Sequence, residues 1–250
     1  MIRIHPLGGI GEILPGCALG ATLSDALAAT VPDARPDDVL VVTSKIVSKA
    51  EGRFADLATV QPTAEAVELA EKVRKDARLV QLVLDESVGI VRAAPHVLIT
   101  RHRTGHVMAN AGIDRSNLGQ EGDLALLLPL DPDRSAEALR EALGARWPEP
   151  PAVVVSDSFG RPWRYGTTNV AVGASGFPSL LDRRGEPDRD GRPLEVTQMA
   201  LGDMIASAAG LAMGEGAEGI PAVLVRGFHW SVPARPAADL IRPLSEDLFR

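Results

Sequence analysis

Two lysines and a serine directly follow a short apolar run, where they could hold an anion. Residues 39–43 are apolar or β-branched, and Ser44, Lys45 and Lys49 come next. Open sheets bind ligands at the ends of their strands, and a lysine supplies a positive point charge for phosphate or carboxylate. A solvated loop with surface lysines is the alternative explanation of this segment.

A second polar segment, residues 110–117, groups one acid with two amides around a glycine. Asp114 and Asn117 follow Gly112, which has no side chain and so lets a ligand approach the backbone. A simple aspartate turn explains the same residues almost as well. The segment taken alone is therefore weak support for a binding site.

An acid and a hydroxyl stand side by side where a third apolar run ends. Residues 153–155 are three valines, and Asp157 and Ser158 follow them closely. Carboxylate and hydroxyl oxygens suit hard cations such as Mg²⁺ and Mn²⁺. Arg161 and Arg164 come shortly afterwards, and their planar guanidinium groups could hold a carboxylate or a phosphate. An aspartate that caps the next turn explains Asp157 equally well.

A glycine-rich stretch, residues 213–221, precedes the last clear apolar run. It carries Glu215 and Glu218 among three glycines, so its backbone can approach a ligand. The alternative is a loop that only ends a helix, with Gly214 as the C-terminal cap. The stretch matches neither a Walker loop nor the dinucleotide-binding fingerprint, so we expect neither of those nucleotide folds.

Together the four segments supply oxygen ligands and cations in equal number. The oxygen ligands come from Asp114, Asp157, Ser158 and Glu215, and the cations from Lys45, Lys49, Arg161 and Arg164. This set fits a nucleoside triphosphate that is held through divalent metal ions. The five histidines are scattered without metal-binding spacing. No nucleophile-elbow sequence supports a serine triad.

Short apolar runs bounded by turn formers predict the strands that must position these groups. We expect strands at residues 39–43, 97–100, 153–155 and 222–225. Because the runs are nearly continuous, both faces of these strands should be buried. Three- and four-residue apolar spacing predicts one helix over 67–84, with Thr63 as its N-cap. Further helices are expected over 135–143 and 195–213, and an exposed loop over 182–192.

Strands and helices do not alternate strictly along the chain, which disfavours a doubly wound sheet. The expected fold class is mixed α/β (α+β), with buried mixed sheets and helices in two lobes, neither Rossmann nor P-loop. The chain has 250 residues, 45% of them hydrophobic and 24% charged, which is enough to bury a core without disulfides.

Composition also excludes several classes of protein. The single cysteine, Cys17, rules out an intrachain disulfide and a multi-cysteine zinc site. A net charge of −7 argues against a general nucleic-acid binder. No apolar run approaches the ~18 residues of a membrane-spanning helix. We therefore expect no nucleic-acid or membrane partner, and a cytoplasmic location.

The four segments, in this order, resemble the coenzyme F420-0:L-glutamate ligases from residue 6 to about residue 227. The resemblance rests on KIVSKAEGR at 45–53, NAGIDRSN at 110–117, DSFGR at 157–161 and GEG at 214–216. It implies a mixed α/β fold, a homodimer, and an enzyme that uses GTP and two Mg²⁺ or Mn²⁺ ions, with K⁺ as a further candidate. Residues 1–250 are expected to form a single catalytic unit of two interleaved lobes, without the nitroreductase-like domain that follows in some relatives.

The resemblance also implies roles for individual residues. The metal-binding positions are Asp114, Asp157, Ser158 and Glu215. The nucleotide-binding positions are Ile10, Gly11, Glu12, Ile13, Ser44, Lys45, Lys49, Asn117, Met213, Gly214, Gly216, Ala217, Glu218, Gly219 and Ile220. We expect catalytic roles for Lys49, Arg161 and Arg164. Ser158 departs from the family's threonine but keeps the hydroxyl, and the chain after His229 does not align.

The expected chemistry is amide ligation. The γ-phosphoryl group of GTP activates the terminal carboxylate of coenzyme F420-0 as an acyl phosphate, and the amine of L-glutamate displaces the phosphate. The first glutamate is attached through its amine and later ones are γ-linked. The protein's part is mainly positioning and charge neutralisation. A metal-dependent phosphohydrolase and a non-catalytic nucleotide-binding protein are the alternatives, since the same groups could serve either.

Overall fold

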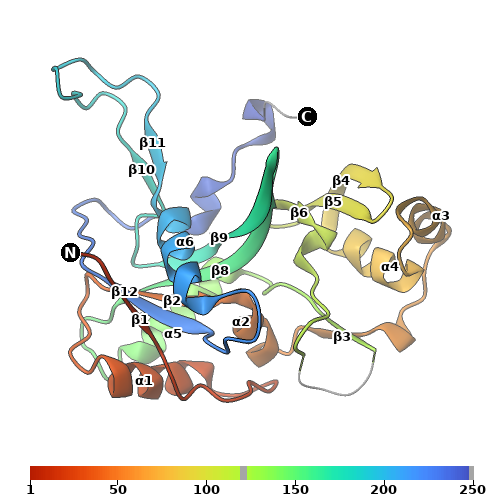
Figure 1. Ribbon diagram of the computed structural model, residues 1–250, viewed down its shortest axis with the longest axis horizontal. Helices are drawn as coiled ribbons and strands as arrows, with labels where there is room; N and C mark the ends of the chain where they lie inside the picture. Colours follow the sequence, from red (N-terminus) through yellow and green to blue (C-terminus); the bar gives the residue numbers. More distant parts are fainter. Residues whose placement is uncertain (119–122, 248–250) are drawn as a thin grey trace.

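A mixed five-stranded sheet forms the centre of the computed structural model, which describes residues 1–118 and 123–247 (Figure 1). Its strand order is β1-β12-β2-β8-β9. Strand β2 is parallel to β8, whereas the other neighbouring pairs are antiparallel. The strands are β1 (Arg3–Pro6), β2 (Val39–Thr43), β8 (Ala152–Arg161), β9 (Arg164–Ser175) and β12 (Ala222–Arg226). The predicted mixed α/β class is confirmed.

Helices cover both faces of this sheet. The helices are α1 (Leu19–Thr30) and α5 (Pro132–Leu143) on one face and α6 (Leu201–Met213) on the other. Successive side chains of a strand point to opposite faces. Accordingly Leu40 and Val42 pack with α1 and α5, while Val39 and Val41 pack with α6. Burial on both faces is confirmed for residues 39–43, 153–155 and 222–225.

A third apolar core lies beside the sheet and is built from residues between 66 and 125, at the right of Figure 1. The elements that form this core or pair with its strands are β3 (Phe54–Asp56), α3 (Ala64–Val73), α4 (Ala77–Asp85), β4 (Ser87–Ala94), β5 (Val97–His102), β6 (Val107–Ala109) and β7 (Leu124–Leu126). Strand β5 buries Leu98 here but leaves Val97 41% exposed. The prediction that both faces are buried was therefore wrong for residues 97–100, because only one face of β5 packs against this core.

The single helix predicted over 67–84 is also wrong. Thr63 caps α3 as predicted, since its hydroxyl accepts the N–H of Ala66. Arg74 then adopts a left-handed conformation with φ of 54°, which ends α3, and Asp76 caps a new helix, α4. The apolar spacing continues through this break, so periodicity alone does not reveal it.

Two other predicted helices start elsewhere. The helix predicted over 195–213 begins only at Leu201, because β11 (Gln198–Ala200) first pairs with β10 (Leu180–Asp182). The helix predicted over 135–143 begins at Pro132, where the Asp131 carboxylate caps it by accepting the N–H of Arg134.

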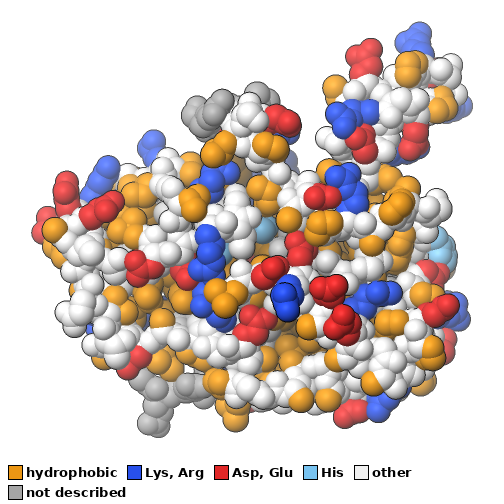
Figure 2. Space-filling view, turned by 180° about the vertical axis from the view of Figure 1, so that it is seen from behind, with side chains coloured by type: hydrophobic (Ala, Val, Ile, Leu, Met, Phe, Trp, Pro, Cys, Tyr) orange, Lys and Arg blue, Asp and Glu red, His pale blue; other side chains and the backbone are white. Residues whose placement is uncertain are grey.

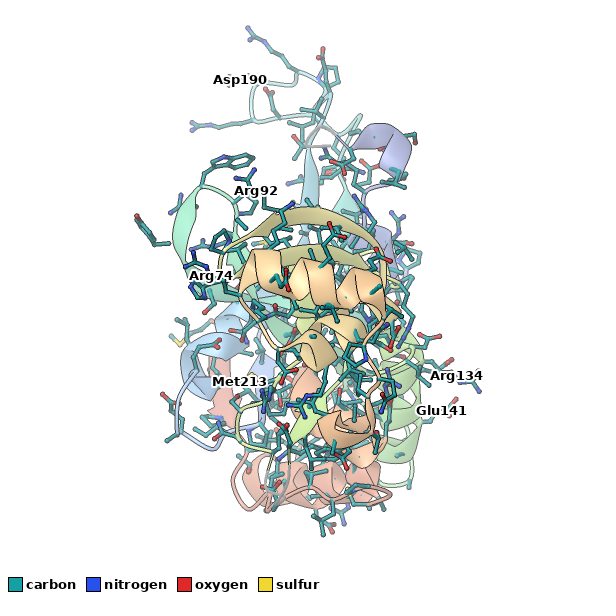
Figure 3. The ribbon with its side chains drawn as sticks, turned by 90° about the vertical axis from the view of Figure 1, so that its right-hand side faces the viewer. Arg74, Arg92, Arg134, Glu141, Asp190 and Met213 are labelled. Carbon is teal, nitrogen blue, oxygen red and sulfur yellow. The ribbon has the colours of Figure 1, made fainter. Side chains whose placement is uncertain are left out.

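The exposed loop predicted over 182–192 is confirmed. It connects β10 to β11 and stands clear of the body as a charge-dense arm (Figures 1 and 2), with Asp190 at its far end in Figure 3. Within the described residues, no helix has the length and apolar character that crossing a membrane requires.

Glu86 joins the third core to the segment that follows the central sheet's strand β2. Its carboxylate lies 3.0 Å from Arg53 Nη2, 2.6 Å from Arg103 Nη1 and 3.3 Å from His102 Nε2. Burial opposes ionisation, but hydrogen bonds with His102 and Arg103 and the charge of Arg53 hold the pKa of Glu86 at about 2. Arg53 also donates to the Leu128 carbonyl, so one buried cluster ties the two parts of the chain together.

We predict that Glu86→Gln lowers the free energy of unfolding at pH 7 by about 2 kcal/mol, because it removes the counter-charge of the partly buried Arg53 and of the more exposed Arg103. The folded pKa lies below the ordinary value of 4.5. Glu86 therefore stabilises the fold fully above about pH 4.5, and this contribution is lost as the pH falls towards 2. Denaturant unfolding at pH 7 and pH 3 measures both effects. Glu186 forms an exposed ion pair with Arg183 and provides the control. Glu186→Gln should lower the free energy of unfolding by no more than ~1 kcal/mol.

Candidate functional site

One edge of the central sheet collects segments that are far apart in the sequence. Thr43, the last residue of β2, pairs with Ser156 in the parallel strand β8. Antiparallel β12 starts beside β2, with Ala222 opposite Val42, and β1 ends beside β12 with Pro6 opposite Val223. The residues that follow β1 and β2, the loop before β12 and the middle of β8 therefore meet at the same edge.

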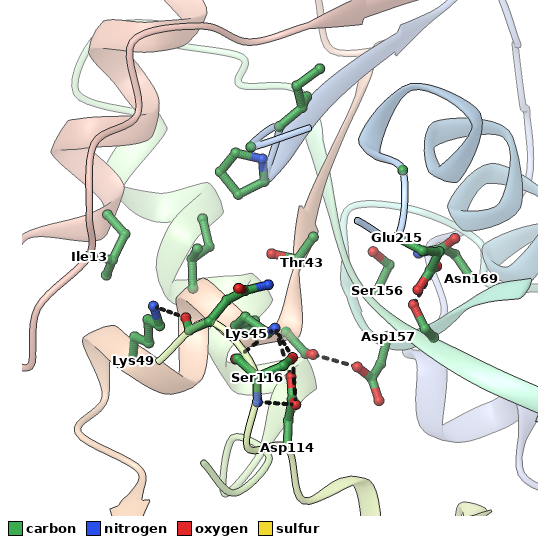
Figure 4. Close-up of a pocket in the computed structure, with 18 of the residues that line it drawn as sticks. Ile13, Thr43, Lys45, Lys49, Asp114, Ser116, Ser156, Asp157, Asn169 and Glu215 are labelled. Atoms are coloured by element: carbon green, nitrogen blue, oxygen red, sulfur yellow. Dashed lines mark hydrogen bonds and ion pairs between the residues drawn. The ribbon is translucent and has the colours of Figure 1, made fainter. Parts of the chain in front are cut away.

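A cavity of about 660 Å³ lies at this edge (Figure 4). Four of the predicted site residues are absent from its lining, namely Met213, Glu218, Arg161 and Arg164. The others all line it: Ile10, Gly11, Glu12, Ile13, Ser44, Lys45, Lys49, Asp114, Asn117, Asp157, Ser158, Gly214, Glu215, Gly216, Ala217, Gly219 and Ile220. The tertiary structure thus brings the four polar segments together around one hollow.

Lys49 is buried in this wall although it carries a charge. The segment after β2 is a helix, α2 (Ser44–Ala50), and not a solvated loop. Only 5% of the Lys49 side chain is exposed, and its Nζ donates to Glu12 Oε1 at 2.5 Å and to the Asn117 carbonyl at 2.8 Å. A buried ammonium group needs such partners. Lys49 consequently holds three segments of the cavity wall in contact.

Lys45 reaches from α2 to the 110–117 segment. Its Nζ lies 2.7 Å from Asp114 Oδ2 and donates to the hydroxyl and carbonyl of Ser116, both at 3.2 Å. Asp114 Oδ1 also accepts the Ser116 N–H at 2.8 Å, which is the aspartate turn that the sequence left open. Burial opposes ionisation, yet hydrogen bonds from Lys45 and Ser116 lower the pKa of Asp114. The aspartate turn is therefore present, and Asp114 also lines the cavity; its role as a ligand stays a prediction.

Asp157 faces the cavity from β8. Its Oδ1 accepts a hydrogen bond from the Ser44 hydroxyl at 2.8 Å (Figure 4). Burial, helped by the negative charges of Asp114 and Glu215, raises the pKa of Asp157 to about 6, against the hydrogen bonds from Ser44 and the Ser158 backbone. Negative charge is thus concentrated at this point beyond what the neighbouring cations neutralise.

The oxygens at this point are suited to a divalent cation whose other coordination positions are filled by water and by a substrate phosphate. The Ser158 hydroxyl donates to Glu215 Oε1 at 2.7 Å, beside Asp157. In the part of the chain that the structure describes, no three Asp, Glu, His or Cys side chains could enclose a metal by themselves. Mg²⁺ commonly takes only one or two carboxylates and completes its shell with water and substrate phosphates. The oxygen donors of Asp157, Ser158 and Glu215 match this coordination preference.

The extension of strand β8 explains why Arg161 and Arg164 do not line the cavity. Strand β8 does not end near residue 155 but continues to Arg161. At about 3.3 Å per residue, this carries Arg161 roughly 13 Å beyond Asp157. There Arg161 donates to the Tyr165 carbonyl at 3.0 Å in an exposed hairpin turn, which also carries Arg164. Their contact with a substrate stays a prediction.

Met213 and Glu218 flank the cavity without facing it. Met213 is the last residue of α6 and only 4% exposed, because it belongs to the apolar core beneath the sheet. Glu218 turns back and accepts the N–H of Gly216 at 2.8 Å, so it shapes the glycine loop. These two residues support the wall of the cavity from behind.

Some polar lining residues were missed by the sequence analysis. Ser116, Ser156 and Asn169 all line the cavity. Ser116 and Ser156 lie next to predicted site residues and could have been included on that ground. Asn169 lies on β9 directly opposite Ser158. No local sequence signal marks it, because its place depends on how β9 pairs with β8.

Comparison with known proteins agrees with this geometry. Residues 9–227 match the family model described as F420-0:Gamma-glutamyl ligase. The chain is 41% identical to the coenzyme F420:L-glutamate ligase of Methanopyrus kandleri, over 100% of this chain and 98% of the relative. It is 44% identical to the enzyme of that name from Natronomonas pharaonis, over 96% and 90%. The chain therefore belongs to the F420-0:gamma-glutamyl ligase family of enzymes.

Proposed function

We propose that this chain ligates L-glutamate to the terminal carboxylate of coenzyme F420-0 and that GTP drives the reaction. The observation that carries the proposal is the convergence of Asp114, Asp157, Ser158 and Glu215 with Lys45 and Lys49 around one cavity. Its volume lies within the range of about 300–1,000 Å³ that is typical of ligand sites. Family membership names the acceptor and the amino acid.

The two sides of the cavity suit different parts of the reaction. On one side, Lys45 and Lys49 are suited to a triphosphate, which needs cations, and the glycine-rich backbone of residues 214–219 adds N–H donors. On the other side, Asp157, Ser158 and Glu215 would hold Mg²⁺ or Mn²⁺, which when bound neutralises phosphate charge during transfer. The chain's own residues thus orient the nucleotide so that its last phosphate faces the acceptor.

A carboxylate is a poor electrophile, so one of its oxygens must first become part of a leaving group. Transfer of the γ-phosphoryl group to a carboxylate oxygen of coenzyme F420-0 gives an acyl phosphate and GDP. The glutamate nitrogen then attacks the acyl carbon, loses a proton, and the carbon–oxygen bond to phosphate breaks. This chemistry depends mainly on alignment of the reactants, which a preformed cavity provides. From the family resemblance we expect a homodimer, and from the composition a cytoplasmic location.

The first prediction tests the reaction itself. Purified protein supplied with coenzyme F420-0, glutamate, GTP and Mg²⁺ or Mn²⁺ should form a product heavier by one glutamyl residue, together with GDP and phosphate. Mass spectrometry of the product and a phosphate assay measure this. Phosphate release that does not need glutamate would instead identify a phosphohydrolase, and no turnover at all would identify a nucleotide-binding protein.

The second prediction concerns Asp157. Asp157→Asn should abolish turnover, because the amide cannot supply the negative charge that a divalent cation needs. The fold should persist, since removal of a carboxylate with a raised pKa relieves repulsion from Asp114 and Glu215. Activity and thermal melting are measured together. Full activity at ordinary metal concentration would remove Asp157 from the metal site.

The third prediction concerns Lys49. Lys49→Met keeps the apolar stem and should weaken GTP binding by about 1.5–3 kcal/mol, the usual worth of a hydrogen bond to a charged group. Calorimetry with metal present measures the dissociation constant. Glu12→Gln is the matched control, since it removes the ion pair but keeps the lysine. An unchanged constant in Lys49→Met would show that Lys49 only joins the three segments of the wall.

A further inference from the structure

Asn169 is a buried amide that faces the cavity without a partner. It is 8% exposed and lines the hollow next to Glu215 (Figure 4). Within residues 1–118 and 123–247, only its backbone carbonyl accepts a hydrogen bond, from the Ser207 hydroxyl; its carboxamide makes none. The amide atoms of Asn169 are not fully buried, because they open onto the cavity. The unpaired amide is therefore available to bond a ligand there.

A glycine behind Asn169 fixes the direction of this amide. Gly210 of α6 packs so closely that a Cβ there would lie 2.1 Å from Asn169 Oδ1 and 2.7 Å from its Cγ. Glycine inside a helix is less favourable than alanine, so a helical glycine at a close contact has a packing reason. Because Oδ1 is packed against Gly210, the N–H groups of Nδ2 are left for the cavity.

The neighbours of Asn169 define what it can bind. Asp157, Ser158 and Glu215 surround it, and the Ser158 hydrogen is already donated to Glu215. Lys45 is bonded to Asp114, and Lys49 to Glu12. Among the described side chains that line the cavity beside the acids, the Asn169 carboxamide thus offers N–H groups that no other side chain uses. An oxygen with negative charge is the group that such a donor recognises.

We propose that Asn169 donates a hydrogen bond to the acceptor carboxylate, the one that is activated and then attacked by the glutamate amine, and that Gly210 positions it for this contact. The proposal rests on the proposed function. A neutral donor suits the task, since it does not compete with a divalent cation for the acids and does not titrate. The same N–H can follow the oxygen as negative charge develops on it during attack.

Four variants separate this role from a structural one. Asn169→Ala removes the donor, and Asn169→Asp replaces it by a charge that repels a carboxylate. Gly210→Ala adds a methyl group that lies outside the cavity and displaces the Asn169 amide. Alanine also favours the helix more than glycine does. Leu211→Ala changes the adjacent, 85% exposed residue of α6 and serves as the control. For each we measure kcat and KM for coenzyme F420-0 and for glutamate, the Kd for GTP with Mg²⁺, and the melting temperature.

We expect Asn169→Ala to lower kcat/KM for coenzyme F420-0 about 100-fold, the effect typical of losing one such donor, and Asn169→Asp to lower it further. Gly210→Ala should lower it at least ~10-fold without a lower melting temperature. A fifth variant that combines Asn169→Ala with Gly210→Ala should be no worse than Asn169→Ala alone, because residues that act through one contact are not additive. The Kd for GTP should stay within about twofold, and Leu211→Ala should match the wild type.

Other results would overturn the proposal. If kcat/KM for coenzyme F420-0 is unchanged in Asn169→Ala, the amide does not contact the acceptor. If GTP binding weakens as much as turnover falls, Asn169 serves the nucleotide instead. A wild-type protein that forms no product refutes the proposed function on its own. Calorimetry with coenzyme F420-0 then decides on Asn169, since equal affinity in wild type and Asn169→Ala refutes the contact.

Discussion

The parallel pairing of β2 with β8 is the constraint on which the site depends. Residues in register on adjacent parallel strands lie side by side, and the end of β2 therefore lies beside the middle of β8. Thr43 opposite Ser156 therefore places Ser44 against Asp157, although 113 residues separate them. The antiparallel neighbours β12 and β1 bring the glycine loop and the N-terminal loop to that edge. A slip of one residue would turn each side chain of β2 to the opposite face of the sheet and move Ser44 away from Asp157.

Charge balance is the second determinant of the cavity. Lys49 and Lys45 sit in the wall with Glu12 and Asp114 as partners, which removes the cost of an isolated buried charge. Among the described residues, Asp157 and Glu215 bond to the hydroxyls of Ser44 and Ser158 rather than to cations. The raised pKa of Asp157 reflects both its burial and its acidic neighbours. The cavity therefore combines a neutralised side with an acidic side. A phosphate–metal pair complements that arrangement better than either ion alone.

The third core contributes to the site through its connection to the sheet. Asp114 and Ser116 come from that part of the chain and reach Lys45 across the cavity. The cluster around Glu86 binds Arg53, which directly follows the turn after α2. The main-chain bridge of Asp114 to Leu126 fixes the aspartate from the other side. Stability of the Glu86 cluster and geometry of the cavity are thereby linked.

The sequence by itself determined the mixed fold class, the strands 39–43 and 222–225, and most of the residues around the cavity. The fold class and the strands follow from continuous apolar runs and caps, whose physics is local. The residues around the cavity follow in part from the short polar segments and otherwise from the resemblance to the family. Only the tertiary structure decided that β8 runs on to Arg161, that Arg74 breaks a helix in a left-handed conformation, and that Lys49 is buried. It also decided the place of Asn169, because the approach of β9 to β8 and α6 joins residues that no local pattern connects.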